Sequence, residues 1–185
     1  MESSLRQLID RQKVSDVLST YCRGVDRCDV SLVKSAYHVD SFDDRGYWRG
    51  SGHEFAEFVV DRLLKANSAT THSITNILID FQGAYARSEA QVMATLVRRD
   101  TSPIVADVIG GRYVDRLSQR DGIWRIEERT VVLDWHKVET WHPGEAPFSL
   151  DDFYVGKRGD RSDPIFAMLS HNSVRVESDS SLPQE

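Results

Sequence analysis

Two residues, Asp26 and His72, have the chemistry of a proton-transfer pair. Asp26 belongs to the stretch YCRGVDRCD, residues 21–29, which closes an apolar helical stripe, so its carboxylate is expected at the edge of the core. His72 opens the first long strand-like segment and shares strand parity with Ile74, which indicates an inward imidazole. A carboxylate that binds one imidazole nitrogen fixes the ring tautomer and makes the other nitrogen a better general base.

Each of the two residues also has a structural interpretation. Asp26 could cap backbone N–H groups at the end of its helix, and His72 could be a hydrogen-bonded residue of the core. Their separation in the sequence does not establish that they meet. Contact between them inside the fold is therefore the observation on which a catalytic assignment depends.

Three helices are expected to position these residues. Apolar side chains recur at spacings of three and four over residues 5–25, which predicts a helix that buries one face. We expect Gly24 to loosen or end its last turn and Asp29 to cap a short second helix. Residues 38–50 have the composition of an irregular polar connection. The sequence SGHE, residues 51–54, then has capping-box spacing and predicts the start of the third helix.

Four β segments follow the helices, each with alternating or β-branched side chains. Turn formers separate the segments, and Asp121-Gly122 is the strongest hairpin signal among them. Gly110-Gly111 inside the third segment predicts a bulge that curves the sheet. We therefore expect an α+β fold in which three N-terminal helices pack into a strongly curved, mostly antiparallel sheet around a conical cavity. The segments are residues 71–81, 86–99, 106–119 and 123–135.

Composition limits the class of protein. The chain has 185 residues, of which 40% are hydrophobic and 28% charged, as in an ordinary globular domain. Its formal net charge of -6 argues against binding to nucleic acid or to an anionic membrane surface. Because the N-terminus lacks signal-peptide features and no apolar run approaches the ~20 residues of a bilayer span, we expect a cytoplasmic protein. Cys22 and Cys28 are then expected to be reduced thiols.

Metal and cofactor motifs are not expected. His136 and His142 lie near Asp134, but their spacing matches no common set of metal ligands. The glycine-containing stretch GKRGDRSDP lacks the preceding strand and following helix of a phosphate-binding loop. We therefore expect neither a metal nor a cofactor.

The order of three motifs resembles a known family. GVDRCD, THSITNILIDF and GGRYVDRLSQRDGIWRIEER follow one another as in the SnoaL-like group of the nuclear transport factor 2-like superfamily, and are most similar to scytalone dehydratase and hexachlorocyclohexane dehydrochlorinase. The resemblance covers about residues 5–135. It implies the cone-shaped, cystatin-like α+β barrel, and an Asp–His pair, here Asp26 and His72, that removes a proton from a carbon next to the departing group.

The resemblance implies roles for two further residues. Arg129 stands where the dehydrochlorinase has an arginine on its last strand, available to stabilise a leaving anion or an enolate; alternatively it is a surface charge paired with Glu127 or Glu128. Tyr21 stands where that enzyme has a lysine and is more similar to the dehydratase. A phenol donates a hydrogen bond without a positive charge, which makes chloride elimination the less favoured chemistry. Tyr21 could equally be a core aromatic residue.

Four other residues are candidates for substrate contact. Tyr47 and Trp48 precede the third helix and could form a wall of the cavity or pack against the core. Asn76 has the strand parity of His72, although a hydrogen bond to the neighbouring strand is an alternative. Tyr113 could point inward near Gly111 or pack as a core residue.

The expected function is a cofactor-independent, dehydratase-like lyase that acts on a hydrophobic cyclic or polycyclic hydroxy-carbonyl compound. An isomerase or a polyketide cyclase of the same fold uses similar proton transfers. A noncatalytic ligand-binding or assembly module, such as a dioxygenase small subunit, is the alternative from another class, because fold alone does not determine function.

The sequence also leads to expectations about domain organisation and assembly. Residues 1–135 should form the barrel, residues 136–172 an extension that packs on its own or a neighbouring subunit, and residues 173–185 a disordered tail. Aromatic residues in the extension, together with the resemblance, favour a homo-oligomer, with a trimer preferred over a dimer.

Overall fold

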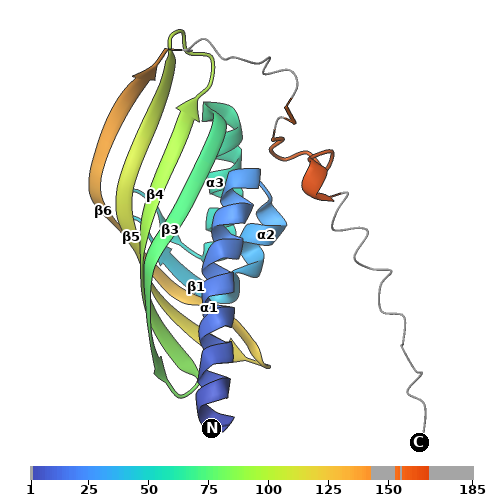
Figure 1. Ribbon diagram of the computed structural model, residues 1–185, viewed down its shortest axis with the longest axis vertical. Coiled ribbons are helices and arrows are strands. Elements are labelled where there is room, and N and C mark those ends of the chain that lie inside the picture. The colour runs from blue at the N-terminus through green and yellow to red at the C-terminus, as the bar shows by residue number, and fades with distance from the viewer. Residues whose placement is uncertain (1, 143–152, 155, 167–185) are drawn as a thin grey trace, which may run out of the picture. The chain divides into compact units, whose positions relative to one another are not determined.

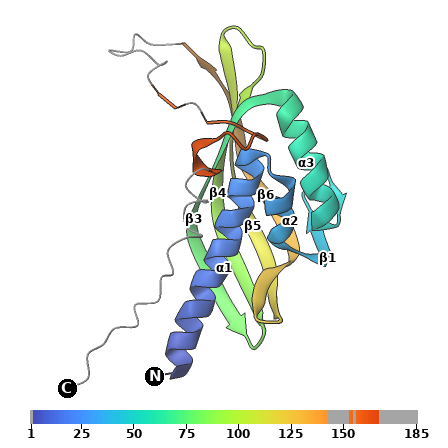
Figure 2. The same ribbon diagram turned by 90° about the vertical axis from the view of Figure 1, so that its right-hand side faces the viewer.

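The computed structural model describes residues 2–142, 153–154 and 156–166. The chain divides into two compact units, Met1–Gly144 and Glu145–Glu185. In the first unit three helices lie on one side of a curved six-stranded sheet (Figures 1 and 2). Its elements are α1 (Glu2–Arg27), α2 (Val30–Ser35), β1 (Tyr37–Asp44), β2 (Arg49–Gly50), α3 (Gly52–Ala66), β3 (Asn67–Gln82), β4 (Tyr85–Arg98), β5 (Ile104–Arg120) and β6 (Ile123–Trp141).

Helix α1 buries the C-terminal part of its apolar stripe. Leu18, Tyr21 and Val25 are buried in the core. The N-terminal part of the stripe is largely exposed, contrary to expectation, and the first hydrogen bonds between α1 and the sheet are made by Asp10 and Arg11. The periodicity therefore predicts the helix correctly but not where the sheet begins to cover it. The exposed apolar residues are Leu5, Leu8 and Ile9.

Gly24 lies inside α1, which continues to Arg27, so the expectation that it ends the helix is wrong. The reason for glycine here is close packing: a Cβ at Gly24 would lie 2.8 Å from both Cγ2 and the backbone N of Val33. Val33 is the buried residue of α2. Gly24 therefore lets α2 pack directly against the last turns of α1.

Side-chain caps fix the starts of the two shorter helices. The Asp29 carboxylate accepts a hydrogen bond from the backbone N–H of Leu32 at 2.9 Å, which begins α2. At the start of α3, Ser51 and Glu54 form the expected capping box. Both caps agree with the sequence-based prediction.

The sheet has the strand order β2-β1-β6-β5-β4-β3. Neighbouring strands are antiparallel except β1 and β6, which are parallel. Tight turns at Gly83 and at Asp121-Gly122, where the backbone has positive φ, join β3 to β4 and β5 to β6. This order places β3 at one edge of the sheet, where its first residues can approach α1.

Residues 38–50 are not an irregular connection as expected, because most of them form β1 and β2. In β1 the buried positions include the polar Ser41 and Asp43, whereas Phe42 is exposed, so the usual alternation of strand residues is reversed. Asp43 is tolerated inside because the Tyr37 hydroxyl donates to it at 2.6 Å. Because these inward side chains are polar, the sequence pattern does not predict this strand.

The expected bulge at Gly110-Gly111 is present in β5. The register with β6 shifts between these two glycines, which pair with Trp135 and Leu133 respectively. A Cβ at Gly110 would overlap the Trp135 indole, and one at Gly111 would overlap the Val132 carbonyl oxygen. The glycines thus allow β6 to bend closely over β5.

The predicted α+β fold, with helices packed into a curved and mostly antiparallel sheet, is confirmed. Strand β6 continues past residue 135, the expected end of the barrel, as far as Trp141. None of the helices in the described part of the chain is both long and apolar enough to cross a bilayer.

The second unit is described for residues 153–154 and 156–166. Asp163 orders this segment by accepting hydrogen bonds from the backbone N–H groups of Lys157 and Ile165. The Arg161 guanidinium lies 5.0 Å from the centre of the Phe166 ring. Of the aromatic residues expected to mediate packing of the extension, Phe148 lies outside the described residues, as does the predicted tail of residues 173–185.

Candidate active site

The structure brings Asp26 and His72 into direct contact. His72 Nδ1 lies 2.6 Å from Asp26 Oδ1, and the backbone N–H of His72 donates to Asp26 Oδ2 at 2.8 Å. The last turn of α1 supplies the carboxylate and the first half of the edge strand β3 supplies the imidazole. Both side chains are mostly buried, with 19% of Asp26 and 11% of His72 exposed. The contact is therefore a partly desolvated one inside the fold.

Two hydrogen bonds to one carboxylate define the orientation of the imidazole. An ionised carboxylate only accepts hydrogen bonds, so Nδ1 must carry the proton that it shares with Asp26 Oδ1. Nε2 makes no hydrogen bond within the described part of the chain. The bond from the His72 backbone locks the carboxylate in place at the same time. The pair thus leaves Nε2 available to accept a proton.

A pocket of about 410 Å³ adjoins the pair. Its size is within the usual range for small-molecule sites. The pocket lies between α1 and the beginning of β3, and it combines apolar, hydroxyl-bearing and charged side chains. Its lining residues are Ser19, Cys22, Arg23, Asp26, Arg27, Thr70, Thr71, His72 and Ile74.

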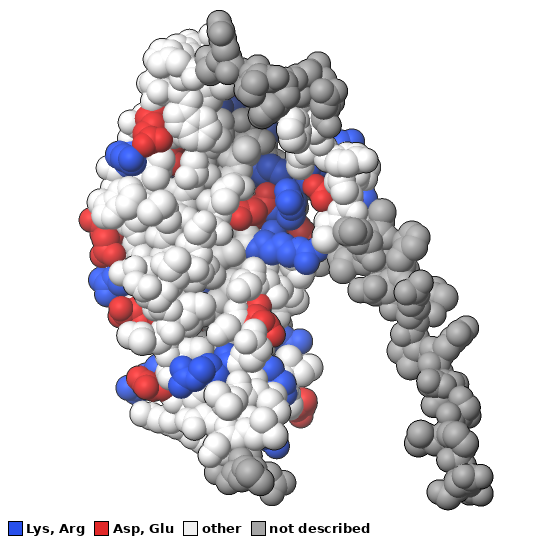
Figure 3. Space-filling view, viewed as in Figure 1, with Lys and Arg blue, Asp and Glu red and all other residues white. Residues whose placement is uncertain are grey.

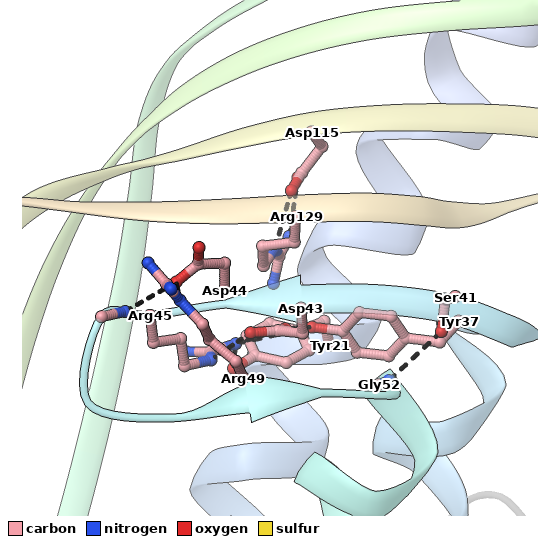
Figure 4. A network of polar contacts seen from close by, with 11 residues as sticks. Tyr21, Tyr37, Ser41, Asp43, Asp44, Arg45, Arg49, Gly52, Asp115 and Arg129 are labelled. Carbon is pink, nitrogen blue, oxygen red and sulfur yellow. Dashed lines mark hydrogen bonds and ion pairs between the residues drawn. The ribbon is translucent and has the colours of Figure 1, made fainter.

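Arg129 lies in a separate, fully buried cluster (Figure 4). Its Nε and Nη2 atoms each donate to Asp115 at 2.7 Å. Its guanidinium carbon lies 4.2 Å from the ring centres of both Tyr21 and Tyr113. Burial by itself lowers the pKa of Arg129, but Asp115, Tyr37 and Tyr21 together raise the pKa well above its usual value. Arg129 Nη1 is buried and has no hydrogen-bond partner within the described part of the chain.

Arg129 does not pair with Glu127 or Glu128, the alternative partners expected from the sequence. Glu127 and Glu128 instead pair with Arg116 at the surface. Asp115, directly opposite Arg129 in the β5–β6 register, was not anticipated. A signal was present in the sequence, because Asp115 has the same strand parity as Tyr113 and Leu117 and so was placed to point inward.

A second buried arginine extends this cluster. Arg45 Nη2 donates to the Tyr21 hydroxyl at 2.8 Å, and Arg45 also forms an ion pair with Asp43 at 2.7 Å (Figure 4). Burial raises the pKa of Tyr21 to about 12, against the opposing effect of Arg45 and Arg129. Tyr21 is therefore a neutral phenol at ordinary pH. Sequence reasoning missed Arg45 and Asp43 because they belong to the segment expected to be irregular.

Cys22 lies between the two groups of residues. It lines the pocket with Asp26 and His72, and the charges of both Arg129 and Asp26 act on its thiol. Burial raises the pKa of Cys22 to about 12, which keeps it a neutral thiol. The four candidate catalytic residues thus form two neighbouring groups: Asp26 and His72 line the pocket, whereas Tyr21 and Arg129 are outside its lining.

The four candidate substrate-binding residues lie in different environments. Tyr113 is buried against Tyr21, with ring centres 5.6 Å apart. Trp48 is half-buried and packs on Phe55, and Tyr47 is exposed beside Arg62.

Asn76 does not reach the pocket. The expected parity with His72 is broken by a bulge between Thr75 and Leu78, where Asn76 has φ of 50°. The Asn76 side chain is exposed and bonds to Gln91. The alternative hydrogen bond to the neighbouring strand is therefore the one observed.

The described residues include no group of three or more His, Cys, Asp or Glu side chains that could hold a metal ion. His136 instead accompanies Arg98 in contacting Asp107. On the face drawn in Figure 3, basic side chains have acidic ones close beside them.

Comparison with known proteins agrees with the fold. The sequence profile of the SnoaL-like domain matches residues 6–130. A scytalone dehydratase candidate from Novosphingobium aromaticivorans has a TM-score of 0.65 at 18% identity, with 79% of this chain and 95% of that chain covered. A type 2 hexachlorocyclohexane dehydrochlorinase, LinA, has a TM-score of 0.68 at 19% identity, with 78% and 98% covered.

A Nostoc punctiforme protein of unknown function with a cystatin-like fold has a TM-score of 0.57 at 15% identity, with 68% of this chain and 92% of that chain covered. Comparison with curated protein sequences found no significant match. At these identities the structural likenesses establish the fold.

Proposed function

Because this chain belongs to the SnoaL-like domain family, we propose that it is a cofactor-independent lyase of the dehydratase type, with His72 as general base. The observation that carries the proposal is the 2.6 Å contact between His72 Nδ1 and Asp26 Oδ1 beside a pocket. A scytalone dehydratase candidate and a dehydrochlorinase among the structural relatives support elimination chemistry on this fold. The proposed substrate is a cyclic or polycyclic hydroxy-carbonyl compound.

The proposed reaction begins with proton removal from the carbon next to the carbonyl group. His72 Nε2 accepts this proton, and the Asp26 carboxylate stabilises the imidazolium that forms. The electron pair left on carbon forms a double bond as the neighbouring hydroxyl group departs. The same imidazolium returns the proton to that hydroxyl, so the products are an enone and water, and neutral His72 is regenerated.

Two buried residues have supporting roles in this proposal. Tyr21 is a neutral phenol outside the pocket lining, and its hydroxyl accepts a bond from Arg45, so its proposed role is to hold the buried charges behind the pocket in place. Arg129 lies outside the pocket lining and supplies positive charge from behind Cys22, whose thiol lines the pocket and is influenced by that charge. Charges in such a dry environment act more strongly than in water.

Exchange of substrate protons with deuterium oxide tests the base directly, because it needs no knowledge of the leaving group. Hydroxy-ketone probes would be followed by NMR with the purified protein. His72→Gln should slow exchange and elimination by roughly 10²- to 10⁴-fold, the usual contribution of a general base. His136→Gln, which changes a histidine outside the pocket, is the matched control. Equal rates for the native protein and the folded His72→Gln variant would refute the catalytic assignment.

A noncatalytic binding module is the rival proposal. It is favoured by the enclosure of Arg129 and Tyr21 in a cluster in which Asp115 already engages the guanidinium. Such a module would bind pocket ligands without His72-dependent exchange, and an assembly subunit would co-purify with a different chain. The exchange experiment therefore separates the two proposals.

A further inference from the structure

The pocket beside Asp26 and His72 differs in charge from the chain as a whole. Arg23 and Arg27 line the pocket one turn apart on α1, and Asp26 is the carboxylate among the lining residues. With a neutral imidazole, two positive charges and one negative charge leave the lining with an excess of one positive charge. The whole chain has a formal charge of -6. The positive pocket is therefore a local feature rather than a consequence of composition.

Arg23 makes no ion pair and no hydrogen bond among the residues that the structure describes. Many other arginines of the first unit have a carboxylate partner, as Arg98 has in Asp107 and Arg112 has in Asp134. Arg27 has an interaction of its own, so the inference depends on Arg23. A free guanidinium at the pocket is available to bind an anion, and its planar donors suit a carboxylate.

A second observation in the pocket also indicates a ligand with oxygen atoms. Thr70 lines the pocket and is buried, with 8% of its surface exposed. Its hydroxyl has no hydrogen-bond partner in the described part of the chain. Buried hydroxyl groups are usually satisfied, so an unpartnered one among the lining residues is a candidate contact for a bound polar group.

The spacing on α1 sets the distance between anion and base. Residues three apart on a helix have Cβ atoms about 5–6 Å apart, and Asp26 lies three residues after Arg23. Since Asp26 holds His72, the guanidinium and the imidazole lie within the span of one small molecule. Of the remaining lining residues, Cys22 and Ile74 are apolar, whereas Ser19 and Thr71 carry hydroxyl groups.

We propose that the substrate of this pocket is an organic acid, whose carboxylate is bound by Arg23 while its reacting carbon lies against His72 Nε2. This inference rests on the proposed function, since it names the class of substrate for the same site. A carboxylate held at one end would orient the substrate and confine its reactive C–H bond near the base.

Benzoate and benzamide provide a direct test, because they have nearly the same shape and differ in charge. Each would be titrated into the ¹⁵N-labelled full chain, with shifts of the Thr71 and His72 amide signals as the readout. Benzoate should bind at least about tenfold more tightly than benzamide, as expected for a charge-assisted hydrogen bond. Arg23→Gln should remove that preference, and Arg23→Lys should retain part of it.

Arg62→Gln is the matched control, because Arg62 is an exposed arginine on α3 outside the pocket lining. It should leave the preference for benzoate unchanged. Equal affinity for the two probes, failure of benzoate to bind at 50 mM, or an undiminished preference in Arg23→Gln would overturn the inference.

The same titration in His72→Gln separates this inference from the proposed function. That variant should still prefer benzoate, because Arg23 is unchanged, even though base catalysis is removed. If only this inference fails, the native protein shows no preference for benzoate but still exchanges protons of neutral hydroxy-ketones in a His72-dependent way. If only the proposed function fails, that exchange is absent but benzoate binding by Arg23 is still measured.

Discussion

At the scale of single residues, two kinds of buried charge have different consequences. The Asp26–His72 contact is partly exposed and leaves one imidazole nitrogen without a hydrogen-bond partner among the described residues. The Arg129–Asp115 pair is completely buried and uses both carboxylate oxygens. The first arrangement suits reversible proton transfer. The second suits a permanent charge, which the surrounding tyrosine rings also stabilise.

The buried pair leads to a prediction about stability. Asp115→Asn keeps the size of the side chain but leaves the Arg129 charge uncompensated in the core. We expect the free energy of unfolding to fall by about 3–5 kcal/mol, as for other buried pairs that lose one partner. Urea denaturation measures this change. Glu128→Gln, at an exposed ion pair, should cost no more than about 1 kcal/mol, and similar losses for both variants would contradict the argument.

The Cys22 thiol gives a second prediction at this scale. Because its pKa is about 12, roughly one thiol in 10⁴ is ionised at pH 8, and the thiolate is the reactive form. Iodoacetamide should therefore modify Cys22 at least about 100-fold more slowly in the native protein than in urea, as followed by peptide mass spectrometry. The unfolded thiol ionises near pH 9, so the free energy of unfolding should also fall as the pH rises from 9 towards 12. Rapid native labelling would contradict the burial of Cys22.

At the scale of elements, close backbone packing positions Asp26. Gly24 brings α2 against the last turns of α1, and Asp26 lies in those turns. The pair with His72 further depends on the edge position of β3 in the sheet. Small residues at contacts between elements therefore control the geometry of the proposed site.

Substitution of Gly24 tests this packing. Alanine favours a helix over glycine by up to about 1 kcal/mol, but its methyl group would meet the Val33 side chain and backbone at 2.8 Å. We expect overpacking to dominate, so that Gly24→Ala lowers the free energy of unfolding by about 1–3 kcal/mol. Ser19→Ala, an exposed change on the same helix, should be nearly neutral. A stabilised Gly24→Ala protein would show that α2 can move away without cost.

At the scale of the whole molecule, the first unit leaves apolar side chains uncovered on the face of the sheet opposite the helices. Along β4 the buried positions include Ala90, Val92 and Ala94, whereas Met93 is exposed. Met93 belongs to the same row as Gly110 and Trp135 of the neighbouring strands. Leu78 and Val114 are exposed in a nearby row. Glu89 lies between Leu78 and Val114 in that row, so the exposed apolar side chains form separate patches among charged groups. Exposed apolar patches of this kind are candidate interface sites.

This surface supports the prediction of a homo-oligomer, with a trimer preferred over a dimer. Native mass spectrometry should give a mass that corresponds to three chains of 21.1 kDa. Met93→Lys should shift the protein towards a single chain by placing a charge on the apolar face. Asp61→Lys, an exposed change on α3, should leave the mass unchanged. A native protein that remains a single chain at 50 μM would contradict the prediction.

Much of the fold could be predicted from the sequence, because it follows from local periodicity and capping. The apolar spacing of α1, the caps at Asp29 and Ser51 and the hairpin at Asp121-Gly122 are properties of short segments. Strand β1 escaped prediction because its inward positions include the polar Ser41 and Asp43, so the alternation of apolar residues that indicates a strand is missing. Asn76 was misplaced because a bulge, which no local pattern announced, reverses the side-chain parity of β3.

The candidate site, like the fold, could be predicted from the sequence only in part. The sequence by itself determined which side chains could transfer a proton, because Asp26 and His72 are chemically suited to that role and lie at the ends of predicted elements. Only the tertiary structure decided that their atoms meet across 46 residues of chain and that Asp115 is the partner of Arg129. It also decided that Arg23 lines the pocket without an ion pair to any of the residues that the structure describes. Local sequence specifies backbone conformation, whereas contact between distant side chains depends on strand register and helix packing, which are settled when the whole core forms.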